Sequence, residues 1–145
     1  KRVYLINEKG NYVTYYNFDD TTGTLTPVQI VSSLPETYTG EGQASAIVLH
    51  PSEEFLYATN RIHESIATYR INKETGFISN IAWNETLGLT PRFATISADG
   101  NALLVANEDS DTIRIFTIQP QSGMLTYSGI TIETGSPTCI AFKTK

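Results

Sequence analysis

The segment LYATNR at residues 56–61 decides the fold, because close variants of it stand at two other places in the chain. Residues 3–8 read VYLINE and residues 103–108 read LLVANE, so an asparagine marks the copies at positions 7, 60 and 107. These markers are 53 and then 47 residues apart, and glycines at positions 23, 76 and 123 repeat the same two spacings. Two independent markers with one pair of spacings indicate a true internal repeat.

Each repeat unit predicts a set of short β-strands separated by turns. A polar loop and a strand of alternating side chains follow the marker asparagine, and a polar turn closed by the repeated glycine leads into a further strand. Glycine suits that turn because it adopts a positive φ without steric cost. The strands expected in this way cover 12–18, 65–71 and 112–118, begin again at 25, 78 and 125, and precede the later two markers at 46–49 and 93–96. No segment shows a helical period.

Four antiparallel strands in a repeat of about 45 residues are typical of a β-propeller blade. We therefore expect an all-β fold, with residues 1–145 forming one propeller segment whose strands are lettered a to d from the central channel outwards. The expected layout is strands b, c and d at 1–33, one full blade at 44–86, a second at 91–133, and a final strand a at 137–143. Propellers close with four or more blades, so three blades predict either a longer parent chain or association with other copies.

With its blades in register, the chain resembles the seven-bladed β-propeller lactonases. The resemblance is carried by HPSEEFLYATNR at 50–61, TPRF at 90–93 and SPTCIAF at 136–142. This family includes the cycloisomerase-type 6-phosphogluconolactonases and is related to carboxy-muconate cyclase. The resemblance implies that the chain is similar to the C-terminal three of about seven blades, and that the parent hydrolyses 6-phosphogluconolactone in the pentose phosphate route. The family's N-terminal blades, which carry a His-rich motif, are not matched by this sequence.

The composition excludes several other classes of function. Fifteen acidic and ten basic residues give a formal net charge of −5. The basic residues are scattered, whereas nucleic-acid phosphates need them clustered, so we expect no nucleic-acid partner. We also expect no membrane partner, because no stretch approaches the roughly 18 apolar residues of a spanning helix. A single cysteine, Cys139, and two separated histidines predict neither a metal site nor a cofactor. The reduced thiol fits a cytoplasmic location.

The strand order sorts the polar candidates onto the two ends of the channel. Strand a begins and strand b ends at one rim, and strand a ends at the opposite rim. The first rim is expected to hold Glu8, Arg61, His63, Arg92 and Glu108. The prominent His50 ends strand a at the opposite rim, so we interpret it as a turn element rather than as a catalytic group.

Opening a lactone needs a base that activates water and positive charge near the carbonyl oxygen. Arg61 either forms an inter-blade ion pair with Glu8 or Glu108, or presents its planar fork to a phosphate or carboxylate in the channel. We expect Glu8, Arg61 and Arg92 to be catalytic and His63 and Glu108 to bind the substrate, a phosphorylated sugar lactone. Two alternatives remain on the same residues: a non-enzymatic propeller that binds a ligand or protein, and a muconate-type lactonising cyclase.

Overall fold

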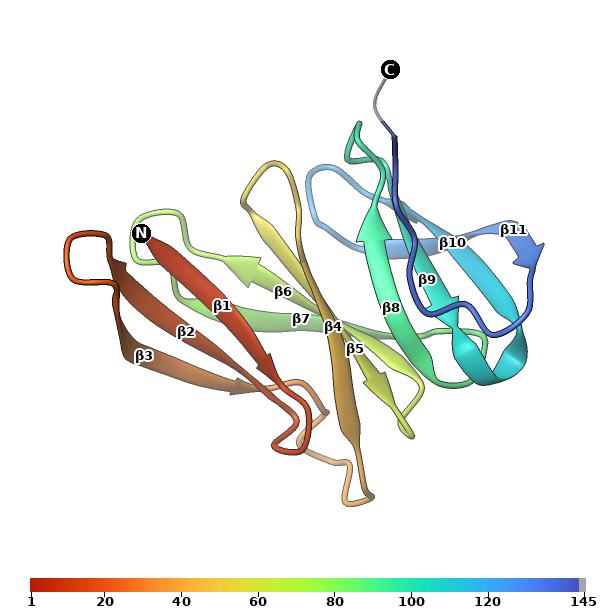
Figure 1. Cartoon of the computed structure of the whole chain (residues 1–145), viewed down its shortest axis with the longest axis horizontal. Coiled ribbons are helices and arrows are strands. Elements are labelled where there is room, and N and C mark those ends of the chain that lie inside the picture. Colours follow the sequence, from red (N-terminus) through yellow and green to blue (C-terminus); the bar gives the residue numbers. More distant parts are fainter. Residues whose placement is uncertain (144–145) are drawn as a thin grey trace.

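Three antiparallel sheets form the chain, as a computed structural model that describes residues 1–143 shows (Figure 1). The first sheet holds β1 (Arg2–Asn7), β2 (Tyr12–Asp19) and β3 (Thr24–Ser32). The second holds β4 (Gln43–Leu49), β5 (Phe55–Arg61), β6 (Ser65–Ile71) and β7 (Ile78–Glu85). The third holds β8 (Pro91–Ile96), β9 (Ala102–Asn107), β10 (Thr112–Ile118) and β11 (Leu125–Glu133), with a single 3₁₀ turn, η1 (Glu108–Ser110), between its middle strands.

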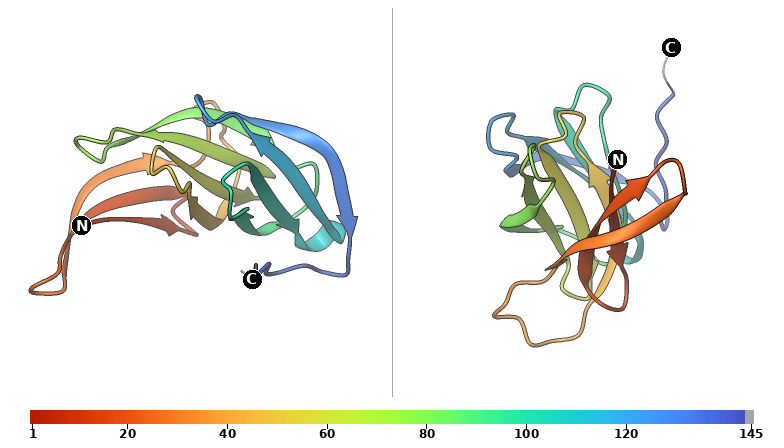
Figure 2. Two further views of the ribbon diagram at one scale, coloured as in Figure 1. Left: turned by 90° about the horizontal axis from the view of Figure 1, so that it is seen from above. Right: turned by 90° about the vertical axis from the view of Figure 1, so that its left-hand side faces the viewer.

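Each sheet is a meander, so neighbours in sequence are neighbours in space. The strand orders are β1-β2-β3, β4-β5-β6-β7 and β8-β9-β10-β11. The sheets follow one another as an arc rather than a closed ring (Figure 2). These are propeller blades, and the all-β fold class expected from the repeat is confirmed. Among the described residues, the first sheet has three strands and each of the other two has four.

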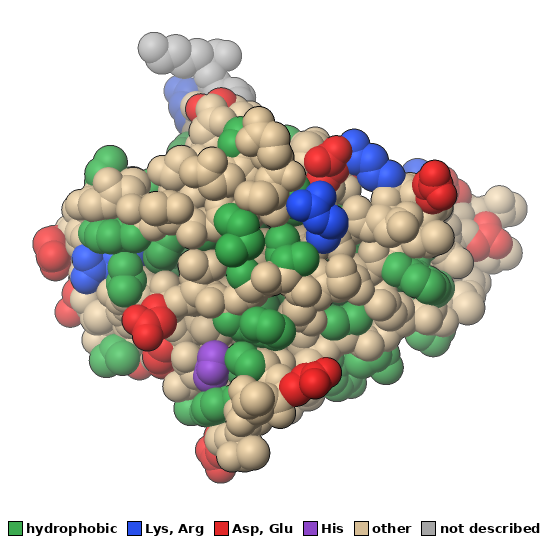
Figure 3. All heavy atoms as spheres, turned by 180° about the vertical axis from the view of Figure 1, so that it is seen from behind, with side chains coloured by type: hydrophobic (Ala, Val, Ile, Leu, Met, Phe, Trp, Pro, Cys, Tyr) green, Lys and Arg blue, Asp and Glu red, His purple; other side chains and the backbone are tan. Residues whose placement is uncertain are grey.

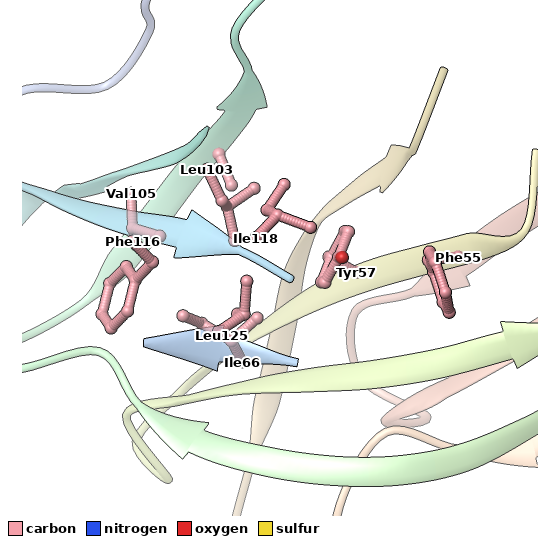
Figure 4. Packing of buried hydrophobic residues seen from close by; sticks show 9 residues of the cluster. Phe55, Tyr57, Ile66, Leu103, Val105, Phe116, Ile118 and Leu125 are labelled. Atoms are coloured by element: carbon pink, nitrogen blue, oxygen red, sulfur yellow. The ribbon is translucent and has the colours of Figure 1, made fainter. Parts of the chain in front are cut away.

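The core lies between the blades. One cluster joins the second and third sheets, where Phe55, Tyr57 and Ile66 meet Leu103 and Phe116 (Figure 4). A second cluster joins the first and second sheets through Val13, Leu56 and Tyr69. Full burial of a large apolar side chain stabilises the fold by about 1.5–3 kcal/mol, so blade-to-blade packing is the main source of cohesion here.

The repeated glycine closes the turn between strands c and d, as the sequence predicts. Gly123 has a φ of 73° and lies against the ring of Phe55 in the preceding blade, which leaves no room for a Cβ. Its carbonyl oxygen accepts a hydrogen bond of 2.9 Å from the hydroxyl of Tyr57. The turn of one blade therefore docks under strand b of the blade before it. Tyr4 repeats this contact with the carbonyl of Gly76, at 2.7 Å.

In the second and third sheets, the marker asparagine ties strand b to the segment that leads from the preceding blade into its own. The Asn60 Nδ2 donates to the Ser33 carbonyl at 2.8 Å, and the Asn107 Nδ2 donates to the Thr86 carbonyl at 3.3 Å. Both asparagines are fully buried. A buried amide that joins two blades explains why the same residue recurs in the repeat.

Residues 137–143, expected as a final strand a, differ from that expectation and form no strand. A strand needs a neighbour for its backbone groups, and this segment is paired with none of the described strands. Pro137 is buried, but the residues after it are exposed or half-buried.

Candidate functional site

One rim of the arc gathers the ends of the b strands and the beginnings of the a strands. Arg61 is the last residue of β5, and Arg92 is the second residue of β8. Glu8 directly follows β1, and Glu108 opens the 3₁₀ turn after β9. The structure joins these four side chains into two pairs, each of one arginine and one glutamate.

The first pair links the first two blades. The Arg61 Nη2 lies 2.7 Å from the Glu8 Oε1, and the arginine side chain is only 14% exposed, against 52% for the glutamate. The Arg61 Nε is buried and has no hydrogen-bond partner among the described residues. A buried guanidinium N–H without an acceptor is costly, and the described residues leave this N–H of Arg61 unsatisfied.

The contact with Arg61 also lowers the pKa of Glu8. The hydrogen bond from Arg61 and then its positive charge hold the pKa of Glu8 below its ordinary value of 4.5, with a smaller contribution from Arg92. Glu8 is therefore ionised at neutral pH and is a weaker base than a free carboxylate. Two roles of Glu8, as a general base and as the group that neutralises Arg61, stay predictions, and the 2.7 Å contact fits the second.

The second pair is looser and more exposed. The Arg92 Nε lies 3.9 Å from the Glu108 Oε2, and the two side chains are 46% and 30% exposed. Arg92 is the extra residue of a β-bulge, because Pro91 faces Asn107 while Phe93 already faces Ala106. Bulges redirect a side chain out of the regular alternation. A long, exposed ion pair contributes little to stability, which leaves the guanidinium of Arg92 available to a ligand.

The structure places His63 on the same rim, in the loop after β5. Its Nδ1 lies 2.7 Å from the Ser65 Oγ, and its ring meets the edge of Tyr38 at a centroid distance of 4.4 Å. These contacts fix the ring in the loop, and none of them joins it to the two arginine–glutamate pairs. Tyr38 comes from the long segment between the first two sheets and was not anticipated from the sequence.

His50 is a turn element, as interpreted from the strand order. Its Nδ1 lies 2.8 Å from the Ser52 Oγ, and its Nε2 lies 2.9 Å from the Gly100 carbonyl oxygen. The ring therefore locks its own turn and links it to the corresponding turn of the third blade.

Sequence reasoning missed a recurring polar position next to the rim. Asn11, Glu64 and Asp111 all have φ values between 51° and 54°. Each follows a marker asparagine by four residues, and that constant spacing was the signal that could have found them. The Glu64 carboxylate accepts the N–H of Ile62 at 3.1 Å and that of Thr90 at 2.8 Å, so it shapes the rim between Arg61 and Arg92.

Other kinds of site are not evident in the described part of the chain. Within residues 1–143, no three His, Cys, Asp or Glu side chains are grouped in a way that could hold a metal ion. The same residues include no helix that is long and apolar enough to cross a membrane. On the face seen in Figure 3, the few basic side chains lie beside acidic ones and do not gather into a patch.

Comparison with known proteins gives a family match over nearly the whole chain. The family described as "Lactonase, 7-bladed beta-propeller" matches residues 1–142. The chain is similar to the 6-phosphogluconolactonase of Bacillus subtilis (strain 168), with 29% identity over 142 residues, which cover 98% of this chain and 41% of that protein.

Solved structures show the same likeness. The periplasmic gluconolactonase of Pseudomonas aeruginosa superposes with a TM-score of 0.88 and 28% identity, over 94% of this chain and 38% of that one. A Lactobacillus plantarum protein has a TM-score of 0.90 at 24% identity, over 95% of this chain and 40% of the other, and shows the fold alone. The chain thus spans about two fifths of the length of these relatives. Since the family match runs over nearly all of its residues, the chain belongs to the seven-bladed β-propeller lactonase family.

Proposed function

We propose that these blades belong to a lactone hydrolase whose substrate is a phosphorylated sugar lactone of the 6-phosphogluconolactone type. The observation that carries the proposal is the largely buried Arg61 on the same rim as the more exposed Arg92. The likeness to a Bacillus subtilis 6-phosphogluconolactonase and a Pseudomonas aeruginosa gluconolactonase supports the substrate class.

The chemistry follows from the two guanidinium groups. Water adds to the lactone carbonyl carbon, negative charge develops on the carbonyl oxygen, and the ring C–O bond then breaks to give the hydroxy acid. Arg61 and Arg92 supply positive charge and N–H donors to that oxygen or to the phosphate, where bidentate contacts suit both groups. This route needs no metal.

The carboxylates assist these arginines. Glu8 keeps the Arg61 guanidinium in place and, being ionised, accepts a proton from the attacking water only as a weak base. We propose that Glu108 accepts hydrogen bonds from sugar hydroxyls and that His63 borders the substrate. The remaining walls of the channel are supplied by further blades of a longer parent or by other copies of the chain.

A binding propeller without enzymatic activity is the second candidate. The 2.7 Å contact between Arg61 and Glu8 is the observation that favours it, since an inter-blade ion pair needs no substrate to explain it. The two candidates differ in what the loss of Arg61 removes: turnover in a hydrolase, and only stability in a scaffold.

The test is a chimera in which residues 1–142 replace the matched region of the Bacillus subtilis relative, so that the other blades are present. Proton release from 6-phosphogluconolactone and from gluconolactone is followed at constant pH, after subtraction of spontaneous hydrolysis. We expect the chimera to hydrolyse the phosphorylated lactone with the higher kcat/KM. Arg61→Gln should lower kcat/KM by about 100-fold or more, as does loss of an oxyanion donor.

Arg70→Gln is the matched control. Arg70 is a strand c arginine that stacks on the Phe55 ring at 5.0 Å, away from the rim, so its loss should leave kcat/KM unchanged. A folded chimera without activity would refute the hydrolase proposal. An Arg61→Gln chimera that is less stable but fully active would favour the scaffold.

A further inference from the structure

The carboxylate of Glu64 joins the backbone on two sides of the rim. Its Oε1 accepts the N–H of Ile62 at 3.1 Å, and its Oε2 accepts the N–H of Thr90 at 2.8 Å. The first N–H belongs to the peptide bond that follows Arg61, and the second lies two residues before Arg92. One side chain therefore holds the backbone next to both rim arginines.

Both of the contacted residues have a backbone conformation that their side chains disfavour. Ile62 has a φ of 74° and Thr90 has a φ of 56°, in the left-handed region that branched side chains rarely enter. Thr90 also precedes Pro91, and a residue before proline ordinarily takes an extended backbone with a negative φ. Such strain persists only where neighbouring contacts hold the backbone, and Glu64 supplies one contact to each residue.

The strain at Ile62 brings no gain in packing. Its side chain is 48% exposed, although an isoleucine stabilises a fold mainly through burial. Strained backbone of this kind gathers at functional sites, where the surrounding structure imposes it. The conformation of Ile62 therefore fits a role in placing the side chain of its neighbour Arg61.

The other two repeats make only part of the contact that Glu64 makes. Asn11 and Asp111 stand at the same position, and the Oδ1 of each accepts an N–H from the segment that follows its blade, at 3.1 and 2.7 Å. Among the described residues, neither side chain accepts an N–H from its own loop. The contact with Ile62 is therefore an addition to what the junction between two blades requires.

The backbone between Thr90 and Arg92 has little freedom of its own. Pro91 stands between them, and its ring fixes its φ at about −65°. The Pro91 carbonyl oxygen accepts a hydrogen bond of 2.6 Å from the hydroxyl of Ser45 on β4. Glu64 and Ser45 both belong to the second blade, which also carries Arg61, so the backbone that bears Arg92 is fixed relative to that arginine.

We propose that Glu64 is a positioning residue that fixes the separation of Arg61 and Arg92, so that both guanidinium groups act on one lactone molecule. Its ionised oxygens form charge-assisted hydrogen bonds, which are stronger than those of a neutral acceptor. Glu64 acts through the arginines and does not itself contact the substrate. Its effect on turnover rests on the hydrolase function proposed above, whereas its effect on the position of Arg61 does not.

Glu64→Asp removes one of the two contacts and keeps the other. Asp111 shows that the shorter acid reaches the segment that follows its blade, so the variant should fold and keep the thermal unfolding midpoint of the unmodified chain. Its carboxylate should no longer reach the N–H of Ile62. Glu85→Asp is the matched control, because Glu85 is exposed on β7 and makes the same change in side-chain length beside Ser65.

The position of Arg61 can be measured without a substrate. In ¹H–¹⁵N NMR spectra of the chain, the Nε–H signal of Arg61 should shift in Glu64→Asp and stay unchanged in Glu85→Asp. The signal of Arg70, which stacks on an aromatic ring away from the rim, should stay unchanged in both variants. An unchanged Arg61 signal in Glu64→Asp would overturn the proposal, whether or not the protein hydrolyses lactones.

Kinetics in the chimera with the Bacillus subtilis blades test the consequence for turnover. Glu64→Asp should lower kcat/KM for 6-phosphogluconolactone by about 10-fold, since a misplacement of about 1 Å can cost as much as about 100-fold and both guanidinium groups are still present. Glu85→Asp should leave kcat/KM unchanged. Equal kcat/KM for the Glu64→Asp and unmodified chimeras would contradict the positioning role.

A double variant separates positioning from a general effect on the fold. An Arg92→Gln chimera lacks one of the two guanidinium groups whose separation Glu64 fixes, so the further change Glu64→Asp should lower kcat/KM by less than about 2-fold. A general structural role would give the same loss in both backgrounds, and that result would overturn the proposal. A chimera without any activity would refute the hydrolase function alone, and the Arg61 signal would then decide the role of Glu64.

Discussion

Two glycines with almost the same backbone conformation should respond very differently to one added methyl group. Gly23 has a φ of 70° and no heavy atom within 4 Å of the place of a Cβ. Gly123 has a φ of 73°, but a Cβ there would lie 2.3 Å from the Phe55 Cδ1. Both turns are closed by glycine for conformational reasons, and only the second is also pressed against a neighbouring blade.

The expected magnitudes follow from these two geometries. Gly23→Ala should cost about 1–2 kcal/mol of unfolding free energy, the strain of an L-residue in the left-handed region. Gly123→Ala should cost that amount plus about 1–3 kcal/mol, because the buried Phe55 ring must move within a packed core. The difference between the two variants isolates the contact between blades.

Urea unfolding followed by Tyr and Trp fluorescence measures both values in parallel. The two variants should share the m-value of the unmodified chain, so that their midpoints report stability alone. Equal losses in the two variants would refute the reasoning, because the turn would then be indifferent to the blade against which it packs.

Three further outcomes are expected. Arg61 holds the pKa of Glu8 below its ordinary value, so the pair should stabilise the fold fully above pH 4.5 and lose this effect as the pH falls through the lower folded pKa. Thermal unfolding measured at several pH values should show this dependence, and Glu8→Gln should remove it. The Ser97 hydroxyl, followed by N–H groups of Asn101, lowers the pKa of Asp99 from 3.8 to about 2, so its stabilising effect should be complete above 3.8 and vanish near 2, and NMR titration of the carboxyl carbon should give the lower value. Tyr57→Phe should cost about 1–2 kcal/mol in urea unfolding, because the buried Gly123 carbonyl loses its donor.

The blade architecture could be predicted from the sequence because the repeated residues occupy equivalent structural positions. The marker asparagine is a buried inter-blade link and the repeated glycine occupies a turn of positive φ, so both positions tolerate few other residues. The distance between repeated residues in the sequence therefore predicted the succession of the blades. The final strand could not be settled in this way, since the alternation of residues 137–143 describes a strand only where a neighbouring edge exists.

The candidate site was only partly predictable. Strand direction was enough to place Arg61 and Glu8 on one rim, but not to show that they touch or that the contact lowers the pKa of the glutamate. The bulge that redirects Arg92 depends on backbone geometry that no single-residue pattern states. The spacing marks the position of Glu64, but it does not show which N–H groups the carboxylate accepts. The Arg61–Glu8 contact and the hydrogen bond from Thr90 to Glu64 arise where two blades meet, so neither blade alone encodes them.

The side chains of Asn11, Glu64 and Asp111 each accept an N–H from the segment that follows their own blade. Each repeat therefore carries the contact that positions the beginning of the next one. In such a chain each blade contacts only the blades next to it. Its free energy of unfolding is therefore close to a sum of one contribution per blade and one per interface between adjacent blades. A tandem duplication of one unit would bring its own starting contact, and deletion of a unit would leave the junctions on either side able to re-form. The number of repeats can then change in evolution without redesign of the units that remain.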